Sequence, residues 1–355
     1  MTTNSNKEHN KPVSYPCTPS PEETPTNPDR RKLLGHMLLG SVALAATGTL
    51  GSHEERILAA EENATPDAVA GATRRFTNWA KLEDLKEKPA KGKIGKMRVS
   101  RITLGGNLIG GWAHSRDLIY VSDLVKAYHT KEKIFATFQL AEACGITTFL
   151  GNPVMCDVME EYYTKMNGSI EFISDCGGDL NSLKENTQRS IDCGASACYV
   201  HGGLSDDLAS KGNFEPIAEI LEFIRGNGMP AGIGGHYLST IQKCVDAGLK
   251  PDFWMKTLHH SNYWSAQKDR PEHDNIFCRE PDETIEYMNS RPEPWIAFKV
   301  LAAGAIRPND GFKYAFEAGA DFICVGMYDF QIVDDVNIAV DILKGNLNRK
   351  RPWVG

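Results

Sequence analysis

Apolar residues recur in two alternating patterns over residues 98–355. Short runs rich in Val, Ile, Phe and Thr end at Gly or at a polar residue, which is typical of buried strands. Each run is followed by a longer segment with the apolar spacing of a helix. Many of these segments stop at a glycine that follows Ala or Cys, where glycine provides the left-handed cap expected before the next strand. These glycines are Gly145, Gly194, Gly248 and Gly319. The predicted strands lie within residues 99–106, 146–151, 170–176, 197–202, 230–236, 252–260, 294–304 and 321–327.

The number and spacing of these units predict the fold class. Eight strand–helix units in roughly 255 residues match a TIM barrel, which typically takes about 250 residues. A doubly wound open sheet is the alternative, but that architecture rarely has eight equally spaced parallel strands. We therefore predict an α/β protein in which residues 98–355 form one (βα)8 TIM barrel.

The residues ahead of the barrel carry the pattern of an export signal. Residues 1–29 are rich in Pro, Thr, Asn and Ser and have few large apolar side chains, so they are predicted to be disordered. Arg30 and Arg31 precede a weakly apolar stretch, within residues 30–51, that contains several Gly and Ala. A twin arginine before such a stretch is typical of a twin-arginine signal. We expect recognition by the twin-arginine export machinery and a periplasmic or other extracytoplasmic location. The alternative is an uncleaved membrane tether.

A polar segment separates this signal from the barrel. Residues 52–97 are rich in Lys and Glu, so they are predicted to be a charged spacer. Twin-arginine export carries proteins that are already folded, often around a cofactor or a metal. The signal therefore raises the expectation of a bound ion.

The overall composition excludes several classes of protein. The chain is 41% hydrophobic and 24% charged, with a formal net charge of -7, which are the values of an ordinary globular protein. The acidic balance argues against nucleic acid and anionic membranes as main partners, because both require a clustered basic surface. Nine Cys residues without a CxxC pair predict neither a zinc ribbon nor a disulfide scaffold.

The ends of the predicted strands carry candidate metal ligands. In a TIM barrel the chemistry takes place where the strands end at their carboxyl side. Asp175, His201, His236 and His259 follow four successive strands at corresponding heights. Imidazole and carboxylate together suit zinc, manganese or iron. His259 is preferred over His260, because alternation along the strand from Met255 and Thr257 places His259 at the mouth.

Other residues near the strand ends are candidates for catalysis or substrate binding. A lysine on a barrel strand is costly to bury, so Lys256 and Lys299 are each candidates for a Schiff-base nucleophile or an anion clamp, with Lys299 preferred. Asp329 is a candidate base or ligand, with a helix cap as the alternative. Aromatic and polar loop residues either stack on a sugar ring or pack the loops. These residues are Trp112, His114, Asn262, Tyr263 and Trp264.

Five segments, in the same order along the chain, resemble the aldo/keto reductases. AGIGGHYLSTIQKCVDAG is similar to the fifth strand and helix of that family, and AEACGITTFLGNPVM to its second strand. SLKENTQRSIDCGASACYVHG resembles the helix and strand that end in the active-site His, which His201 matches. WIAFKVLAAGAI and GADFICVGMYDFQIVDDVNIAVDIL resemble the seventh strand and the C-terminal strand and helix. The resemblance covers about residues 98–347 and implies a TIM barrel.

The same resemblance implies that the reductase chemistry is missing. Leu150 and Met155 stand where the family has a catalytic Asp and Tyr, and Asp175 lies near the position of its Lys. His236 and Tyr237 replace the Ser-Asn pair that holds the nicotinamide amide. The family's Arg for the adenosine phosphate is also missing after the last strand. NADP is therefore less expected than a divalent metal.

Three hypotheses about function remain open from the sequence. The first is an exported, metal-assisted isomerase, lyase or hydrolase acting on a carbohydrate or polyol, in which Lys299, His201 or Lys256 is catalytic. The second is an NAD(P)-dependent reductase with atypical catalytic residues. The third is a non-catalytic extracytoplasmic barrel that binds a small molecule. The sequence identifies neither the substrate nor the oligomeric state.

Overall fold

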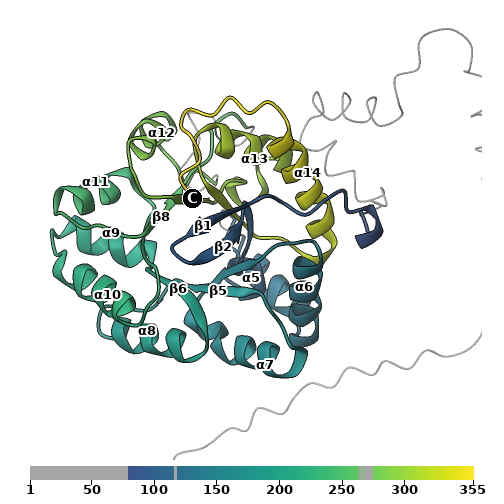
Figure 1. Ribbon diagram of the computed structural model, residues 1–355, viewed down its shortest axis with the longest axis horizontal. Helices are drawn as coiled ribbons and strands as arrows, with labels where there is room; N and C mark the ends of the chain where they lie inside the picture. The colour runs from purple at the N-terminus through teal and green to yellow at the C-terminus, as the bar shows by residue number, and fades with distance from the viewer. Residues whose placement is uncertain (1–78, 116–117, 264–265, 267–274) are drawn as a thin grey trace, which may run out of the picture. The chain divides into compact units, whose positions relative to one another are not determined.

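Eight parallel strands close into a barrel in the order β10-β3-β4-β5-β6-β7-β8-β9, and helices form a ring around it (Figure 1). This computed structural model describes residues 79–115, 118–263, 266 and 275–355. The predicted (βα)8 TIM barrel is confirmed. The predicted disordered N-terminus, the twin-arginine signal, most of the charged spacer and Trp264 lie outside the described residues.

Each predicted strand overlaps an observed one. The strands of the barrel are β3 (Ile102–Gly105), β4 (Thr148–Gly151), β5 (Glu171–Ser174), β6 (Ala195–Val200), β7 (Ala231–Gly235), β8 (Phe253–Thr257), β9 (Trp295–Phe298) and β10 (Phe322–Val325). Several are shorter than predicted, and β8 and β9 end three and six residues early. Because regular alternation of side chains stops where a strand ends, it does not determine the orientation of the residues after β8 and β9.

Helices follow the strands, as the apolar spacing predicts. They are α4 (Gly106–Ile109), α5 (Tyr120–Tyr128), α6 (Lys131–Ala143), α7 (Cys156–Met166), α8 (Leu183–Asp192), α9 (Gly202–Ser210), α10 (Glu215–Gly226), α11 (Leu238–Asp246), α12 (Pro281–Asn289), α13 (Pro308–Glu317) and α14 (Ile332–Lys344). Short 3-10 helices are η2 (Leu82–Asp84), η3 (Pro153–Met155), η5 (Ala302–Gly304) and η6 (Asp329–Gln331). Gly145 and Gly319 end their helices with φ of 87° and 105°, which confirms the predicted left-handed caps. Among the described residues, no helix has the length and apolar character needed to span a bilayer.

The core has two layers that follow the alternation of side chains along the strands. The outer layer packs between the strands and the helices. The inner layer fills the barrel itself and includes Leu150, Ile173, Tyr199, Met255 and Ile296. Because large apolar side chains occupy the interior, the barrel is a packed core, and only its ends are open to ligands.

A hairpin covers the amino end of the barrel. Strands β1 (Lys91–Ile94) and β2 (Met97–Ser100) pair antiparallel, and Figure 1 shows them across the centre of the ring, with the C-terminus beside them. Ile94, Met97 and Val99 belong to the inner core. The hairpin was not predicted, and the expected boundary of the barrel domain at residue 98 falls inside β2. The apolar residues that pack the hairpin against the barrel alternate with charged residues. For this reason the overall composition of residues 52–97 looked like that of a charged spacer.

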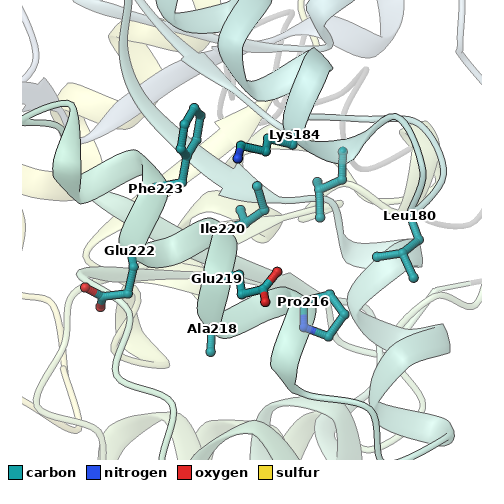
Figure 2. Close-up of a pocket in the computed structure, with 9 residues that line it drawn as sticks. Leu180, Lys184, Pro216, Ala218, Glu219, Ile220, Glu222 and Phe223 are labelled. Carbon is teal, nitrogen blue, oxygen red and sulfur yellow. The ribbon is translucent and has the colours of Figure 1, made fainter.

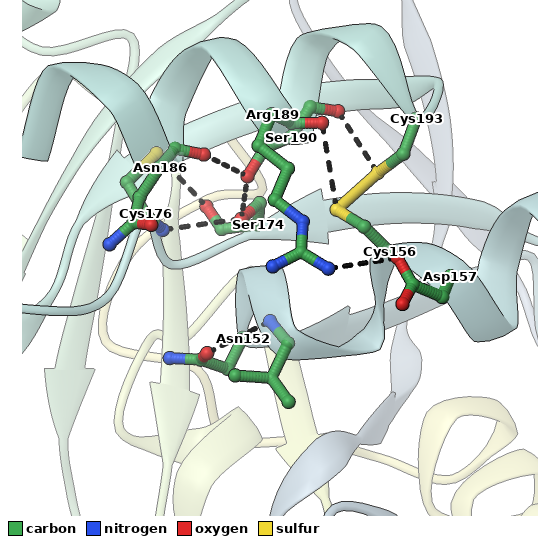
Figure 3. Close-up of a disulfide and its surroundings, with 10 residues drawn as sticks. Asn152, Cys156, Asp157, Ser174, Cys176, Asn186, Arg189, Ser190 and Cys193 are labelled. Carbon is green, nitrogen blue, oxygen red and sulfur yellow. Dashed lines mark hydrogen bonds and ion pairs between the residues drawn. A yellow bond between two sulfur atoms is a disulfide. The ribbon is translucent and has the colours of Figure 1, made fainter. Parts of the chain in front are cut away.

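A disulfide joins two neighbouring helices near β5. Cys156 begins α7 and Cys193 follows α8, their Cα atoms are 5.5 Å apart, and the two residues are 37 positions apart in the chain (Figure 3). An ion pair of 2.8 Å between Arg189 and Asp157 lies beside it. Closing a loop of this length contributes about 4 kcal/mol in the chain-entropy model. The number and spacing of the cysteines predict no disulfide scaffold, and the Cys156–Cys193 bond supports a barrel that has its own large core.

Candidate active site

Three of the predicted catalytic and ligand residues meet at the carboxyl end of the barrel. His201 directly follows β6, His236 directly follows β7, and Lys299 directly follows β9. The rings of His201 and His236 have centroids 6.3 Å apart. Burial lowers the pKa of His201 most, nearby His236 and Lys299 lower it further, and Asp206 raises it. These three side chains, each of which can bind a proton, therefore lie close together at the mouth.

Asp206 holds the imidazole of His236 in one orientation. The distance from His236 Nδ1 to Asp206 Oδ2 is 2.7 Å, and the Asp206 carboxylate also accepts the backbone N–H of His236 and the hydroxyl of Thr240. Burial raises the pKa of Asp206, but the hydrogen bonds from His236 and Thr240 outweigh it and the pKa is lowered. An ionised Asp206 accepts from Nδ1–H, so the neutral His236 presents the lone pair of Nε2.

His201 has the opposite arrangement of its ring nitrogens. The backbone N–H of Gly203 donates to Nδ1 at 3.2 Å, and His201 thereby caps α9. The pKa of His201 is lowered by burial and by nearby His236, which favours the neutral ring. A neutral ring that accepts at Nδ1 carries its proton on Nε2. His201 is therefore a hydrogen-bond donor where His236 is an acceptor.

The backbone of Gly202 allows the two histidines to approach each other. A Cβ at Gly202 would lie 2.9 Å from Cε1 and 3.1 Å from Nδ1 of the His236 ring, and a Cβ at Gly234 would meet the backbone of Gly202. These glycines are needed because the ring of His236 rests on the start of α9. The HGG and GIGGH segments of the sequence therefore form one contact.

Sequence reasoning missed Asp206, although it completes this arrangement. It lies on α9, five residues after His201, and reaches a histidine that follows the next strand. The only signal in the sequence is an acidic residue in the helix that follows a strand-end histidine. That signal does not say whether the carboxylate turns toward the mouth, toward another helix or toward solvent.

Lys299 occupies an unusual backbone conformation. Its φ is 59°, in the left-handed region that non-glycine residues rarely adopt. Nζ lies 3.2 Å from Nε2 of His114 and 4.1 Å from the centre of the Phe277 ring. Burial lowers the pKa of Lys299 to about 8, although nearby Asp206 raises it. About half of the amine is therefore unprotonated near pH 8.

A second unusual group lies next to Lys299. The hydroxyl Oγ1 of Thr257 is fully buried and has no hydrogen-bond partner among the described residues. Thr257 pairs with Phe298, the residue before Lys299, and shares a strand face with Met255 of the barrel interior. A buried hydroxyl without a partner costs about 1–3 kcal/mol, so this group is a candidate contact for a substrate.

Lys256, the other predicted catalytic lysine, has a different environment. It is 1% exposed, and Nζ donates to the backbone carbonyls of His236 at 2.8 Å and of Thr257 at 2.9 Å. Burial lowers its pKa. These bonds fix the backbone below His236, so Lys256 supports the site and does not present its amine to the mouth.

His259 does not have the role of a metal ligand. Its Nε2 accepts the backbone N–H groups of Phe277 and Cys278 at 3.0 and 2.9 Å, and Nδ1 contacts the carbonyl of His260 at 2.8 Å. Burial lowers its pKa to about 4. Both ring nitrogens of His259, a predicted metal ligand, therefore contact the backbone in this arrangement. Strand β8 already ends at Thr257, and the alternation used to orient His259 stops there.

Asp175 lies on another wall of the mouth, after β5. One carboxylate oxygen, Oδ1, accepts from the backbone of Gly177 at 2.8 Å and from Asn152 at 3.1 Å. Burial nevertheless raises the pKa of Asp175 to about 7. Among the described residues, no group of three or more His, Cys, Asp or Glu side chains gathers to hold a metal ion. The four predicted ligands therefore do not form the expected metal centre in this arrangement.

The predicted substrate-binding residues fall into two groups. His114 lies at the mouth through its contact with Lys299, and Trp112, 39% exposed, is on the same loop. Asp329 instead accepts from Tyr128 at 2.5 Å and Lys133 at 2.9 Å, so it joins η6 to α5 and α6. Burial is the largest single effect and by itself raises the pKa of Asp329. The hydrogen bonds from Tyr128 and Lys133, together with the charge of Lys133, outweigh burial, so the pKa is lowered.

The loop after β8 also has structural contacts. The hydroxyl of Tyr263 donates to the carbonyl of Asn275 at 3.0 Å. The backbone N–H of the exposed Asn262 donates to Nδ1 of His260. Tyr263 thus ties the two ends of the loop together. The predicted stacking partner Trp264 lies outside the described residues.

A hollow of about 710 Å³ lies away from these residues. Figure 2 shows it on the outside of the barrel, where α8 and α10 meet. Its lining is mostly aliphatic, with Lys184 over the ring of Phe223 at 5.2 Å. None of the candidate catalytic residues lines it, so the mouth of the barrel remains the candidate site.

Comparison with known proteins bears on the fold. No family model and no curated protein sequence matches the chain. A solved structure described as an aldo-keto reductase from Pseudomonas aeruginosa is similar over 73% of this chain and 99% of its own, with 15% identity and a TM-score of 0.51. An aldo-keto reductase from Bacillus halodurans, in its holo form, is similar over 73% and 92%, with 11% identity and a TM-score of 0.50. The chain shares their barrel fold.

The reductase residues themselves do not follow from that likeness. Leu150 is 3% exposed and belongs to the barrel interior, and Met155 is 4% exposed in the outer core. In the sequence comparison these two positions match the catalytic Asp and Tyr of the aldo/keto reductases. In this chain both positions hold packed apolar side chains. Because a Leu and a Met cannot donate a proton to a carbonyl, the candidate chemistry of this mouth depends on His201, His236 and Lys299.

Proposed function

We propose that the chain is an enzyme that moves protons on a small carbonyl- or hydroxyl-bearing substrate, as an isomerase or a lyase. One observation carries the proposal: Asp206 fixes Nδ1 of His236, whereas Gly203 donates to Nδ1 of His201. The neutral rings thereby offer a base and a hydrogen-bond donor side by side. A base and a donor facing one reacting carbonyl are the requirements for proton transfer at the adjacent carbon.

The roles of the residues follow from their protonation. Nε2 of His236 removes the proton from the carbon or hydroxyl beside the carbonyl, and Asp206 stabilises the imidazolium that forms. Nε2–H of His201 donates to the oxygen on which negative charge develops. Lys299, beside them, adds positive charge or a neutral amine, depending on pH. These roles need no metal, and the described residues do not gather three or more His, Cys, Asp or Glu side chains around one.

The substrate class is inferred from the polar groups of the mouth. Donors and acceptors are available from His114, His201, Thr257 and Lys299, and Trp112 offers an aromatic face nearby. Such a lining suits a compound with several hydroxyl groups next to a carbonyl, and small sugars and polyol-derived ketones are therefore the proposed substrates.

Deuterium exchange tests the proposed function without knowledge of the product. The purified protein is incubated in deuterated buffer with dihydroxyacetone, glyceraldehyde and pentoses, and incorporation next to the carbonyl is followed by NMR. Incorporation that depends on His236 is expected, and His236→Asn is the test variant. Exchange no faster than in buffer for the whole panel would contradict the proposal. Fluorescence titration with reduced nicotinamide cofactor, in the same preparation, tests the reductase alternative.

We further propose that the protein works outside the cytoplasm after twin-arginine export. The support is the Arg30-Arg31 pair ahead of an apolar stretch, together with the Cys156–Cys193 disulfide, a bond that persists mainly in oxidising compartments. Substitution of both arginines by lysine should retain the protein, unprocessed, in the cytoplasmic fraction of a producing cell. Equal export of the substituted and unsubstituted chains would contradict this localisation.

A further inference from the structure

The backbone at Lys299 is held in a costly conformation at the mouth of the barrel. A non-glycine residue in the left-handed region costs on the order of 1 kcal/mol, and it persists where the surrounding structure enforces it, often at functional sites. Strand β9 ends at Phe298, and the turn that follows contains two more left-handed residues, Ala302 and Ala303. This turn carries Lys299 out of the strand and directs its amine to His114 instead of along the barrel wall.

The surroundings of the amine favour a nucleophile over an ion pair. In the described part of the chain no carboxylate forms a salt bridge with Lys299, and its recorded contacts are His114 and the face of Phe277. A lysine kept for structure is usually paired with an acid, whereas a desolvated lysine without one becomes a neutral amine more easily. The lowered pKa agrees with this environment.

We propose that Lys299 forms a Schiff base with the carbonyl carbon of the substrate, an inference that rests on the proposed function and identifies its substrate as an aldehyde or ketone. The neutral Nζ attacks the carbonyl carbon, a C–N bond replaces the C–O π bond, and one of the two protons on nitrogen moves to the oxygen, which accepts a hydrogen bond from Nε2–H of His201. The resulting hydroxyl takes up one proton from the solvent and leaves as water, and the nitrogen keeps its other proton in the iminium ion. The overall change is amine plus carbonyl compound plus one proton to iminium plus water, with no oxidation or reduction.

The iminium ion explains why the other groups surround Lys299. It withdraws electrons from the adjacent carbon, so His236 can remove a proton there to give an enamine. The buried, unpartnered hydroxyl of Thr257 lies on the neighbouring strand, where Thr257 pairs with the residue that precedes Lys299. Return of a proton to a different atom, followed by hydrolysis of the iminium, releases the isomer and restores the amine.

Lys256 provides an internal contrast on the neighbouring strand. It is more deeply buried than Lys299, its Nζ donates to two backbone carbonyls, and it lies on the opposite strand face from Met255 and Thr257. Substrate in the barrel mouth therefore meets the amine of Lys299 and not that of Lys256. The inference thus predicts a modification at Lys299 and none at Lys256.

Reductive trapping tests the inference on the full chain. The protein is incubated with dihydroxyacetone and sodium cyanoborohydride, digested, and each lysine is analysed by peptide mass spectrometry. We expect the mass of one reduced dihydroxyacetone on Lys299, at least tenfold above that on any other lysine. Lys299→Met and Lys299→Arg should remove the label, and the exposed-site control Lys313→Met should retain it. The arginine variant keeps the positive charge, so a purely structural role of the charge would not explain the loss.

The outcomes separate this inference from the proposed function. No label on Lys299, or a label spread evenly over the lysines, overturns the Schiff base. If deuterium exchange into dihydroxyacetone occurs in the same protein without a label, the Schiff base is overturned while the proton-transfer function stands. If Lys299 is labelled but no exchange occurs, the Schiff base is supported and the proton-transfer function is contradicted. Failure of both measurements overturns both.

Discussion

The charged side chains at the two ends of the barrel differ in how completely they are paired. At the amino end, Asp321 is fully buried and accepts from the backbone N–H groups of Trp295 at 3.1 Å and Val354 at 2.8 Å. It also forms an ion pair of 3.3 Å with Arg351. Arg101, on the other side, donates to the carbonyls of Asp321 and Gly355. The charged side chains at this end are held by partners from several elements.

At the carboxyl end, the pairing is selective. Asp206 and His236 satisfy each other, whereas Lys299 lacks an acidic partner among the described residues and Oγ1 of Thr257 has no partner there. The same barrel can thus bury paired charges where they are needed for stability. Lys299 and Thr257 lie at the end where TIM barrels perform their chemistry. The difference indicates that these polar groups at the mouth lack protein partners so that a ligand can bind there, which makes the folded protein less stable.

The largest expected effect on activity comes from Lys299. Lys299→Met should lower turnover by about 10³–10⁴-fold, because it removes the nucleophile, and should leave the fold intact or stabilise it by about 1 kcal/mol by removing a partly buried charge without an acidic partner. Deuterium exchange and urea unfolding measure the two effects. Lys313→Met is the matched control, and a loss of stability in Lys299→Met would mean that Lys299 belongs to the supporting structure.

The matching change at the amino end should affect stability alone. Asp321→Asn removes the charge that Arg351 and its neighbours surround, so the free energy of unfolding should fall by about 3–5 kcal/mol. The activity of the molecules that remain folded should not change. Chemical denaturation with parallel activity assays checks this, and a selective loss of activity without destabilisation would break the distinction between the two ends.

The orientation of His236 should depend on Asp206. Asp206→Asn removes the carboxylate that favours the proton on Nδ1, so kcat/KM should fall by about 10²-fold with little change in KM. Its neighbour Asp207 is exposed and pairs with Lys211 on the same helix, which makes Asp207→Asn a close control. Equal effects of the two substitutions would show that Asp206 acts through helix stability and not through His236.

The reactivity of Lys299 should change with pH near 8. Burial lowers its pKa from 10.5 to about 8, so the unfolded chain binds more protons between these pH values. Stability should therefore rise with pH across this window, and the cost of burying the charge is fully present below pH 8. Competitive labelling of lysines with acetic anhydride should show Lys299 half-reactive near pH 8. A midpoint above pH 10 would contradict the desolvated environment.

The smallest expected effect tests the contact between two strand ends. Gly202→Ala places a methyl group 2.9 Å from the His236 ring, so the ring must move by a few tenths of an ångström. Activity should fall by about tenfold while KM changes little. Gly226 has open space for a Cβ, so Gly226→Ala is the control. Unchanged activity in Gly202→Ala would show that the position of the His236 ring is not critical.

The sequence predicted the barrel because each of its signals is local. Alternating apolar runs and the glycines at Gly145 and Gly319 identify strands and helix ends within a few residues of each other. The hairpin formed by residues 91–100 was missed, since its apolar positions lie within a charged spacer. Its role is visible only when the end of the barrel that it covers is known.

The candidate site was only partly predictable, for reasons of geometry. His201, His236 and Lys299 follow strands directly, so the topology alone places them at the mouth. His259 was oriented by alternation beyond the end of β8, where alternation no longer applies. Asp206 projects from a helix, and its contact with His236 depends on how α9 packs beside β7. Spacing along a chain does not contain that information.

The protonation of two histidines tests the proposed chemistry most directly, because it needs no substrate. Nitrogen-15 NMR of the imidazole rings, assigned with His201→Asn and His236→Asn, reports which nitrogen carries the proton. At a pH where both rings are neutral, we predict the proton on Nδ1 of His236 and on Nε2 of His201. The same tautomer in both rings, or the reverse assignment, would contradict the base and donor roles on which the proposed function depends.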